Sequence, residues 1–198
     1  MYFGLSEDQI FFQDNVKKFL EDQLTLDTVR KITEGEDDLA KEELHKGLIN
    51  LGINNILVPE EHGGLGLDLL FATAVSQSLG EGVATLPFLG PYILAPTAIK
   101  YGASDSQKEK LFADMCENLI NFGIGFSEYF GSRDSSGLNI SDNKVTGKTL
   151  FVLDTDFASH VMIADNKGQI GIVSLDSNDI EMIDLTTVDK TRTYKDCL

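Results

Sequence analysis

Three glycines within four positions are the first residues of this sequence whose types and spacing could do chemistry: residues 63–66 read Gly-Gly-Leu-Gly. A glycine-rich loop can turn its backbone N–H groups toward a phosphate. A P-loop, however, continues with Lys and then Ser or Thr, and a dinucleotide-binding fold places its glycines after a strand; neither signal accompanies this run. We therefore predict that residues 58–68 form a tight, buried corner between helices, with Asp68 as the N-cap of the next helix.

Histidines and paired acids are the other groups with possible metal-binding or acid–base chemistry. His45, His62 and His160 are far apart in the sequence and lack the spacing of metal ligands, so we predict no metal site. Acidic residues cluster at 34–38 and at 60–61, where paired carboxylates could act as acid and base. The polar residues around these clusters favour solvated loops instead.

The chain is strongly acidic, with a net charge of −16 from 32 acidic and 16 basic residues. This charge argues against binding to nucleic acid or to an anionic membrane surface. An anionic nucleotide cofactor would depend on local backbone N–H groups or on a few placed cations. The sequence has no apolar run of the ~20 residues that a membrane span needs, and no signal-peptide pattern at its start. Cys116 and Cys197, the two cysteines, form no disulfide framework, so we expect a cytoplasmic protein.

The elements that must position any site change type near residue 120. Before it the signals are helical: Ser6 with Gln9, and Ser104 with Gln107, have the spacing of capping boxes. After it short apolar runs alternate with turn signals, at Asp142-Asn143 and at residues 165–168, which read Asp-Asn-Lys-Gly. We therefore predict an α+β chain: an N-terminal all-α bundle over residues 1–118, then an antiparallel, β-barrel-like domain over residues 119–198.

Several stretches resemble, in the same order, those of the acyl-CoA dehydrogenase family. Residues 58–66, Val-Pro-Glu-Glu-His-Gly-Gly-Leu-Gly, resemble the VPEEYGGLG corner of that family, with His62 in the place of Tyr. Residues 101–111 resemble its YG…QK…L stretch, and Val-Asp-Lys-Thr-Arg at 188–192 resembles the strand that enters its third domain. The resemblance implies the N-terminal helical domain and the middle β domain of an FAD-dependent oxidoreductase of fatty acid metabolism.

In this family the middle domain holds one face of the flavin ring with two β-segments. Residues 126–133, Phe-Ser-Glu-Tyr-Phe-Gly-Ser-Arg, are similar to the family's Thr-Glu-Pro and Gly-Ser-Asp stretch, and residues 149–155 are similar to its Lys-x-Trp/Phe-Ile-Thr-Asn-Gly stretch. A flat flavin needs apolar surface on one face and N–H groups at its polar edge. The resemblance assigns cofactor binding to Phe126, Ser127, Phe151 and Leu153, and substrate binding to Ser132 and Arg133.

The same residues have plainer interpretations, and some depart from the family pattern. Phe126, Phe151 and Leu153 also fit an ordinary β-core, while Ser132 and Arg133 fit a surface loop. Tyr129 replaces the usual Pro, and Leu153 replaces a hydroxyl residue that bonds to the ring. The lost bond is worth about 0.5–1.5 kcal/mol, so weakened flavin binding is one expectation.

The resemblance also says what lies outside these residues. Family members continue into a C-terminal helical domain that carries the catalytic glutamate, so we expect no catalytic base here and no activity from this chain alone. The full reaction removes the α-proton of an acyl-CoA and transfers the β-hydrogen as hydride to FAD. Two alternatives stay open: a non-catalytic paralogue or partner subunit with weak or no flavin binding, and a flavin oxidase or monooxygenase. The expected partners are an acyl-CoA substrate, acyl-CoA dehydrogenase subunits in a homo- or hetero-oligomer, and an electron-transferring flavoprotein.

Overall fold

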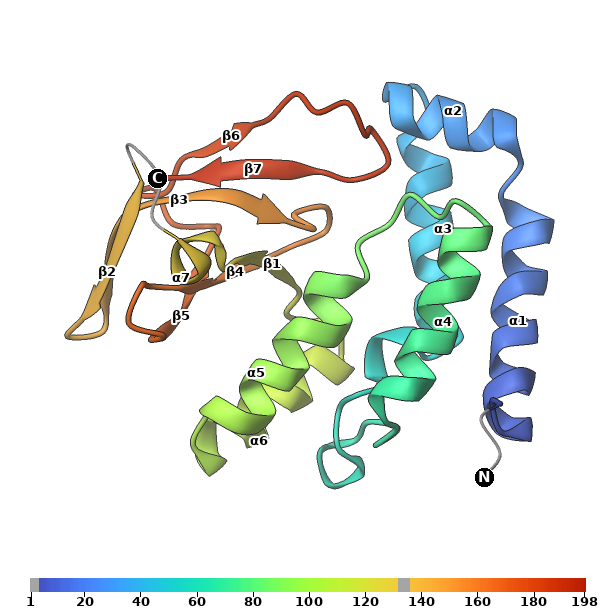
Figure 1. Ribbon diagram of the computed structural model, residues 1–198, viewed down its shortest axis with the longest axis horizontal. Coiled ribbons are helices and arrows are strands. Elements are labelled where there is room, and N and C mark those ends of the chain that lie inside the picture. The colour runs from blue at the N-terminus through green and yellow to red at the C-terminus, as the bar shows by residue number, and fades with distance from the viewer. Residues whose placement is uncertain (1–3, 132–135) are drawn as a thin grey trace. The chain divides into compact units, whose positions relative to one another are not determined.

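The computed structural model describes residues 4–131 and 136–198, and the chain divides into two compact units, residues 1–86 and 87–198 (Figure 1). The first unit is helical. The second contains further helices and all the strands. The predicted α+β class is therefore confirmed, while the domain boundary between residues 118 and 119 stays a prediction.

The first unit is built from four α-helices that bury apolar stripes against one another. The helix α1 begins at the predicted capping box, where Ser6 Oγ accepts from the Gln9 N–H at 3.2 Å and Gln9 Oε1 accepts from the Ser6 N–H at 2.9 Å. It packs against α4, where the Phe12 and Phe71 rings meet edge to face with centroids 5.2 Å apart, and its Val16 and Leu20 side chains are 0% and 2% exposed. The helices are α1 (Glu7–Gln23), α2 (Leu26–Glu34), α3 (Asp38–Asn50) and α4 (Leu69–Glu81), with 3₁₀ turns η1 (Ile53–Asn55) and η2 (Glu60–His62).

The glycine corner before α4 is tight, but two of its three glycines are exposed and Gly64 is half-buried. A Cβ atom on Gly64 would overlap the carbonyl oxygen of Val58, so only glycine fits there. Gly63 and Gly66 adopt φ of 90° and 61°, in the left-handed region, and both are exposed. The prediction of a buried corner was therefore wrong for Gly63 and Gly66. Glycine is needed at position 64 because the backbone of Val58 lies so close, and not because the turn is buried. Asp68 is the predicted N-cap, accepting from the Phe71 N–H at 2.9 Å.

In the residues that the structure describes, the second unit joins short helices to a seven-stranded sheet. The second predicted capping box is present, with Gln107 donating its N–H to Ser104 Oγ at 3.4 Å. The helical segments are η3 (Gly90–Leu94, a π-helical turn), α5 (Ala95–Gly102), α6 (Asp105–Cys116) and α7 (Ser127–Phe130). The strands are β1 (Phe122–Gly125), β2 (Gly137–Ser141), β3 (Lys144–Leu153), β4 (His160–Ala164), β5 (Ile170–Ser174), β6 (Met182–Asp184) and β7 (Tyr194–Cys197).

The sheet is mixed and open, which corrects the prediction of an antiparallel, barrel-like domain. The strand order is β5-β4-β1-β3-β7-β6, with β2 paired to β3 (Figure 1). Within the described residues β5 and β6 end the sheet without pairing to each other. The strands β1 and β4 are parallel. The chain between them includes α7, β2 and β3, and it is long enough for β4 to enter the sheet in the same direction as β1.

Both predicted hairpin turns are present. Asp142 and Asn143 have φ of 50° and 57°, and Ser141 pairs with Lys144, so the β2–β3 loop has two residues in left-handed conformations. This pattern is the type I′ turn, whose twist matches that of the strands. Between β4 and β5 the carboxylate of Asp165 accepts from the N–H groups of Lys167 and Gln169, at 2.8 and 2.9 Å. Local turn chemistry therefore sets the register of both hairpins.

Across the described ranges, no helix combines the length and the apolar character needed to cross a membrane.

Candidate functional site

The structure brings the first predicted flavin segment against the second at the start of α7. Ser127 Oγ donates to the carbonyl oxygen of Leu150 at 2.6 Å, and α7 packs against β3. Phe126, which precedes α7, is half-buried with φ −103° and ψ 7°. Two segments that are far apart in the sequence therefore meet through one short hydrogen bond.

Phe151 lies in a β-bulge that turns its ring outward. The register between β3 and β7 shifts between Thr149 and Val152, and Phe151 adopts φ of 56°. Its neighbours Thr149 and Val152 are 1% and 0% exposed, whereas the Phe151 side chain is 42% exposed. A left-handed conformation at a bulky aromatic residue costs about 1–3 kcal/mol, and such strain clusters at functional sites. The bulge thus exposes an aromatic ring one residue after Leu150, whose carbonyl accepts from Ser127, where an ordinary strand would alternate regularly.

Leu153 ends β3 within the sheet. It pairs with Ile124 of β1 and with Tyr194 of β7, and its side chain is half-buried. The strand β1 ends at Gly125, directly before Phe126 and Ser127, so Leu153 lies beside the strand that leads into these two residues. Ser132 and Arg133, the predicted substrate-binding residues, lie outside the described residues.

Glu128 is a buried carboxylate to which the sequence interpretation assigned no role. Its side chain is 3% exposed. Its Oε2 accepts from Ser136 Oγ at 2.8 Å, and its Oε1 lies 3.2 Å from Ser127 Oγ. The hydroxyl of Ser127 has one proton, so the 2.6 Å bond to Leu150 and the longer contact to Glu128 compete for it. Glu128 therefore connects α7 to residue 136. The sequence signal that could have pointed to Glu128 is the Glu that it shares with the family's Thr-Glu-Pro stretch.

Two exposed aromatic rings adjoin this region. Tyr129 and Phe130 are 55% and 82% exposed and meet edge to face with ring centroids 5.5 Å apart. The Tyr129 ring lies over Gly168 in the β4–β5 turn, where an added Cβ would be 3.3 Å from Tyr129 Cε2. The surface beside Ser127 is thus aromatic as well as polar.

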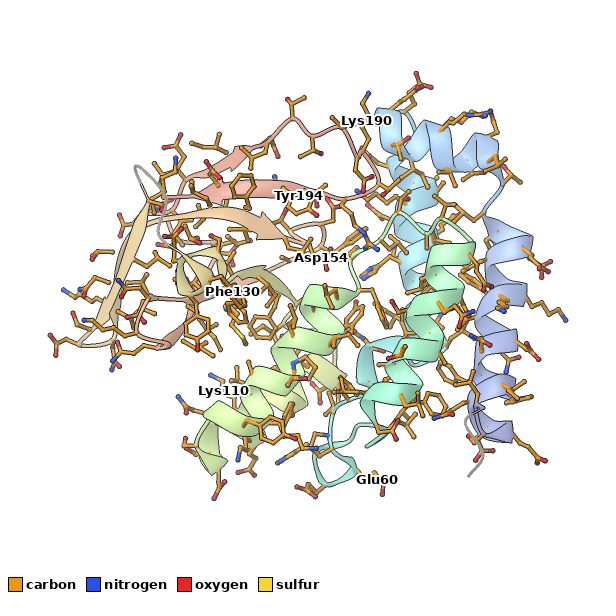
Figure 2. The ribbon with its side chains drawn as sticks, in the orientation of Figure 1. Glu60, Lys110, Phe130, Asp154, Lys190 and Tyr194 are labelled. Carbon is orange, nitrogen blue, oxygen red and sulfur yellow. The ribbon has the colours of Figure 1, made fainter. Side chains whose placement is uncertain are left out.

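Asp154, which directly follows β3, is a buried carboxylate that joins three segments of the second unit (Figure 2). Its side chain is 2% exposed, and its Oδ2 accepts from the Gly90 N–H at 2.7 Å. Its Oδ1 lies 3.9 Å from Arg192 Nη1. Burial raises the pKa of Asp154, and the Gly90 N–H and the Arg192 guanidinium counteract part of that rise. Sequence reasoning missed this residue because its partners lie far from it in the sequence.

The histidines and metal-ligand types are dispersed. His160 Nδ1 lies 2.9 Å from Ser159 Oγ, and burial lowers the pKa of His160. No carboxylate is hydrogen-bonded to this ring in the structure as described, so the pair lacks the orienting acid of a catalytic triad. In the portion of the chain that the structure describes, no group of three or more His, Cys, Asp or Glu side chains could hold a metal ion.

Comparison with known proteins agrees with this architecture. A family model described as acyl-CoA dehydrogenase, N-terminal domain, matches residues 6–118. Mitochondrial isovaleryl-CoA dehydrogenase from Bos taurus is 26% identical over 143 residues, which are 71% of this chain and 33% of that protein. The acyl-CoA dehydrogenase FadE26 of Mycobacterium tuberculosis is 27% identical over 112 residues, which are 54% of this chain and 28% of that protein.

Solved structures share the fold over the whole chain. The ChsE4–ChsE5 complex from Mycobacterium tuberculosis superposes with a TM-score of 0.83 at 19% identity, covering 100% of this chain and 55% of the other. Butyryl-CoA dehydrogenase from Megasphaera elsdenii gives 0.73 at 18% identity, with coverage of 100% and 57%. The chain therefore spans about half the length of these solved chains, and the match spans a third or less of the two curated relatives.

Proposed function

This chain belongs to the acyl-CoA dehydrogenase family, and from that premise we propose that it serves the flavin-dependent oxidation of the CH–CH group of an acyl-CoA thioester. Residues 1–118 and 119–198 correspond, in this proposal, to the family's N-terminal and middle domains. The working protein is cytoplasmic and assembles with acyl-CoA dehydrogenase subunits, and an electron-transferring flavoprotein accepts its electrons. Because no residue of this chain is assigned as the catalytic base, the chain by itself does not dehydrogenate an acyl-CoA.

The observation that carries the proposal is the bulge that exposes the Phe151 ring, next in sequence to Leu150, whose carbonyl accepts from Ser127 Oγ. Bulges re-aim side chains at functional sites, and an exposed aromatic ring offers the apolar surface that a flavin ring packs on. In the proposal Phe151 and Phe126 pack against one face of FAD. FAD, when bound, supplies the hydride acceptor.

The hydroxyl groups of this region fit a flavin less well than its apolar surface does. The Ser127 proton is donated to the Leu150 carbonyl at 2.6 Å, and Leu153 has no hydroxyl at all. The polar edge of a flavin would therefore be bound by main-chain N–H groups, with Ser127 and Leu153 contributing position and apolar contact.

The same shortage of hydroxyl donors favours a second candidate function, that of a partner subunit with weak or no flavin of its own. In this alternative the chain supports an active acyl-CoA dehydrogenase subunit. The complex of ChsE4 and ChsE5, which shares this fold, is a solved example of an assembly with two named components.

Titration of the purified chain with FAD, followed by quenching of flavin fluorescence, tests the proposal. We expect saturable quenching that Phe151→Ala weakens several-fold, because the substitution removes the exposed ring. Phe11→Ala is the matched control, since Phe11 is 70% exposed on α1 and belongs to the other unit. A colourless protein that does not quench FAD would contradict the flavoprotein proposal and leave the partner-subunit function.

A further inference from the structure

A cavity of about 590 Å³ lies within the second unit, bordered by α5, α6, the β4–β5 hairpin and the tip of the β2–β3 hairpin. Small-molecule sites in proteins typically enclose about 300–1,000 Å³. Of the residues predicted to bind flavin, all four of which the structure describes, none is among the described lining residues of this cavity. Its size therefore fits a ligand that the proposed function does not use.

The wall of the cavity is largely apolar. Ala98 and Gly102 of α5 face it, and Met162 of β4 adds a longer apolar side chain. Ile170 and Ile172 contribute from β5, the strand at one end of the sheet, and share a face because they are two residues apart. These two isoleucines are 46% and 38% exposed, so the cavity presents apolar surface that no part of the described chain covers.

The cavity wall also carries polar groups and a positive charge. Lys144, at the start of β3, lines it together with the amide side chains of Gln107, Asn143 and Gln169. No Asp or Glu is among the described lining residues, although 32 of the 198 residues of the chain are acidic. In the described part of the chain, Lys144 makes no ion pair with an acidic side chain. The cavity thus offers three amides and a cation that has no ion pair among the described residues, in a molecule of net negative charge.

We propose that this cavity binds an amphipathic monoanion, such as a free medium-chain carboxylate. The carboxylate meets the Lys144 ammonium group and the neighbouring amides. The tail lies along α5 and β5, between Gly102 and Ile172. A charge-assisted hydrogen bond explains selectivity for the anion, and burial of the tail supplies most of the affinity. The proposal does not depend on flavin binding.

Isothermal titration of the 198-residue chain with decanoate and with decanol, below their aggregation limits, tests the anionic part. We expect one decanoate per chain and at least tenfold weaker binding of decanol, because decanol cannot pair with Lys144. This comparison uses unaltered protein, so no folding defect can mimic the result. Equal affinities for the two ligands, or no binding of decanoate, would overturn the proposal.

Two substitutions locate the ligand. Lys144→Gln is expected to weaken decanoate binding about tenfold while leaving decanol unaffected. Lys110→Gln, an exposed α6 lysine that does not line the cavity, is expected to change neither (Figure 2). Equal losses for both lysine variants would assign the effect to net charge and reject the site.

Gly102→Leu fills the cavity directly. An added Cβ at Gly102 meets no atom within 4 Å, and the residue is exposed, so the larger side chain fits without displacing the fold. We expect it to abolish binding of both ligands. Gly80→Leu, at an exposed glycine of α4 that is equally free of close neighbours, is the matched control and should bind normally. Thermal melting verifies that both variants fold.

Sedimentation of the wild-type chain tests whether a second copy occupies the cavity instead. A wild-type dimer that Gly102→Leu disrupts, together with no binding of decanoate, would assign the cavity to a second copy and overturn the proposal.

Discussion

Two side chains of the second unit, Ser127 and Asp154, connect segments of the chain that are distant in sequence. Ser127 and Asp154 each bond to a backbone group far away in sequence, at Leu150 and Gly90 respectively. A side chain that is already bonded inside the protein is a weaker ligand donor, because binding would first break that bond. The hydrogen-bond partners of Ser127 therefore bear on the proposed flavin site as much as its place in the sequence does.

Asp154 is expected to make stability depend on pH in the opposite sense to an ion-paired surface acid. Burial raises its pKa in the folded state above the ordinary value of about 3.9. The folded state then holds a proton that the unfolded state has lost, so the free energy of unfolding falls as pH rises from about 4 through the folded pKa.

Asp154→Asn should remove this dependence, since the amide oxygen still accepts from the Gly90 N–H. The difference in unfolding free energy between variant and wild type, measured by urea denaturation, should move in favour of the variant as pH rises toward neutrality. Asp14→Asn, at an exposed position of α1, controls for the loss of one negative charge. A constant difference across this pH range would show that Asp154 ionises as it does in the unfolded chain.

Elements whose signals are local were predictable, and those defined by distant partners were not. The capping boxes at Ser6 and Ser104 and the turn at Asp142 were found because each signal lies within a few neighbouring residues. The parallel pairing of β1 with β4 depends on the path of residues 126–159, which no periodicity encodes. The bulge at Phe151 depends on the register against β7. The sequence therefore singled out Phe151 as a predicted flavin-binding residue but did not predict its exposure or its backbone conformation.

The bulge predicts that Gly and Ala variants differ in stability in opposite directions at two positions of β3. At Phe151, where φ is 56°, Gly should give a protein about 1 kcal/mol more stable than Ala does, because glycine adopts this conformation without steric cost. At Val152, which is 0% exposed with no such conformation, Gly should be less stable than Ala. Urea denaturation of the four variants measures both differences. The same order at both positions would mean that the strand runs regularly through Phe151.

At the scale of the whole molecule, the chain combines a helical unit with a mixed sheet, as members of its family do. Its family was identifiable from sequence because the glycine corner and the later stretches keep their order along the chain. The corner itself proved to be a close-packed surface turn, with Gly64 against the carbonyl of Val58. It therefore identifies the lineage, while the proposed flavin site lies in the segments around Ser127 and Phe151.

The net charge of −16 predicts that salt stabilises this chain. Like charges repel one another in the compact state, and raising the ionic strength from about 0.01 to 0.15 M shortens the screening length from about 30 to 8 Å. We expect the melting temperature to rise over this range at pH 7. Near pH 4.4, the isoelectric point of the sequence, the net charge is close to zero and the rise should largely vanish. Calorimetry at the two pH values measures the effect, and a melting temperature that falls with salt at pH 7 would mean that local ion pairs such as Lys17–Glu81 outweigh the overall repulsion.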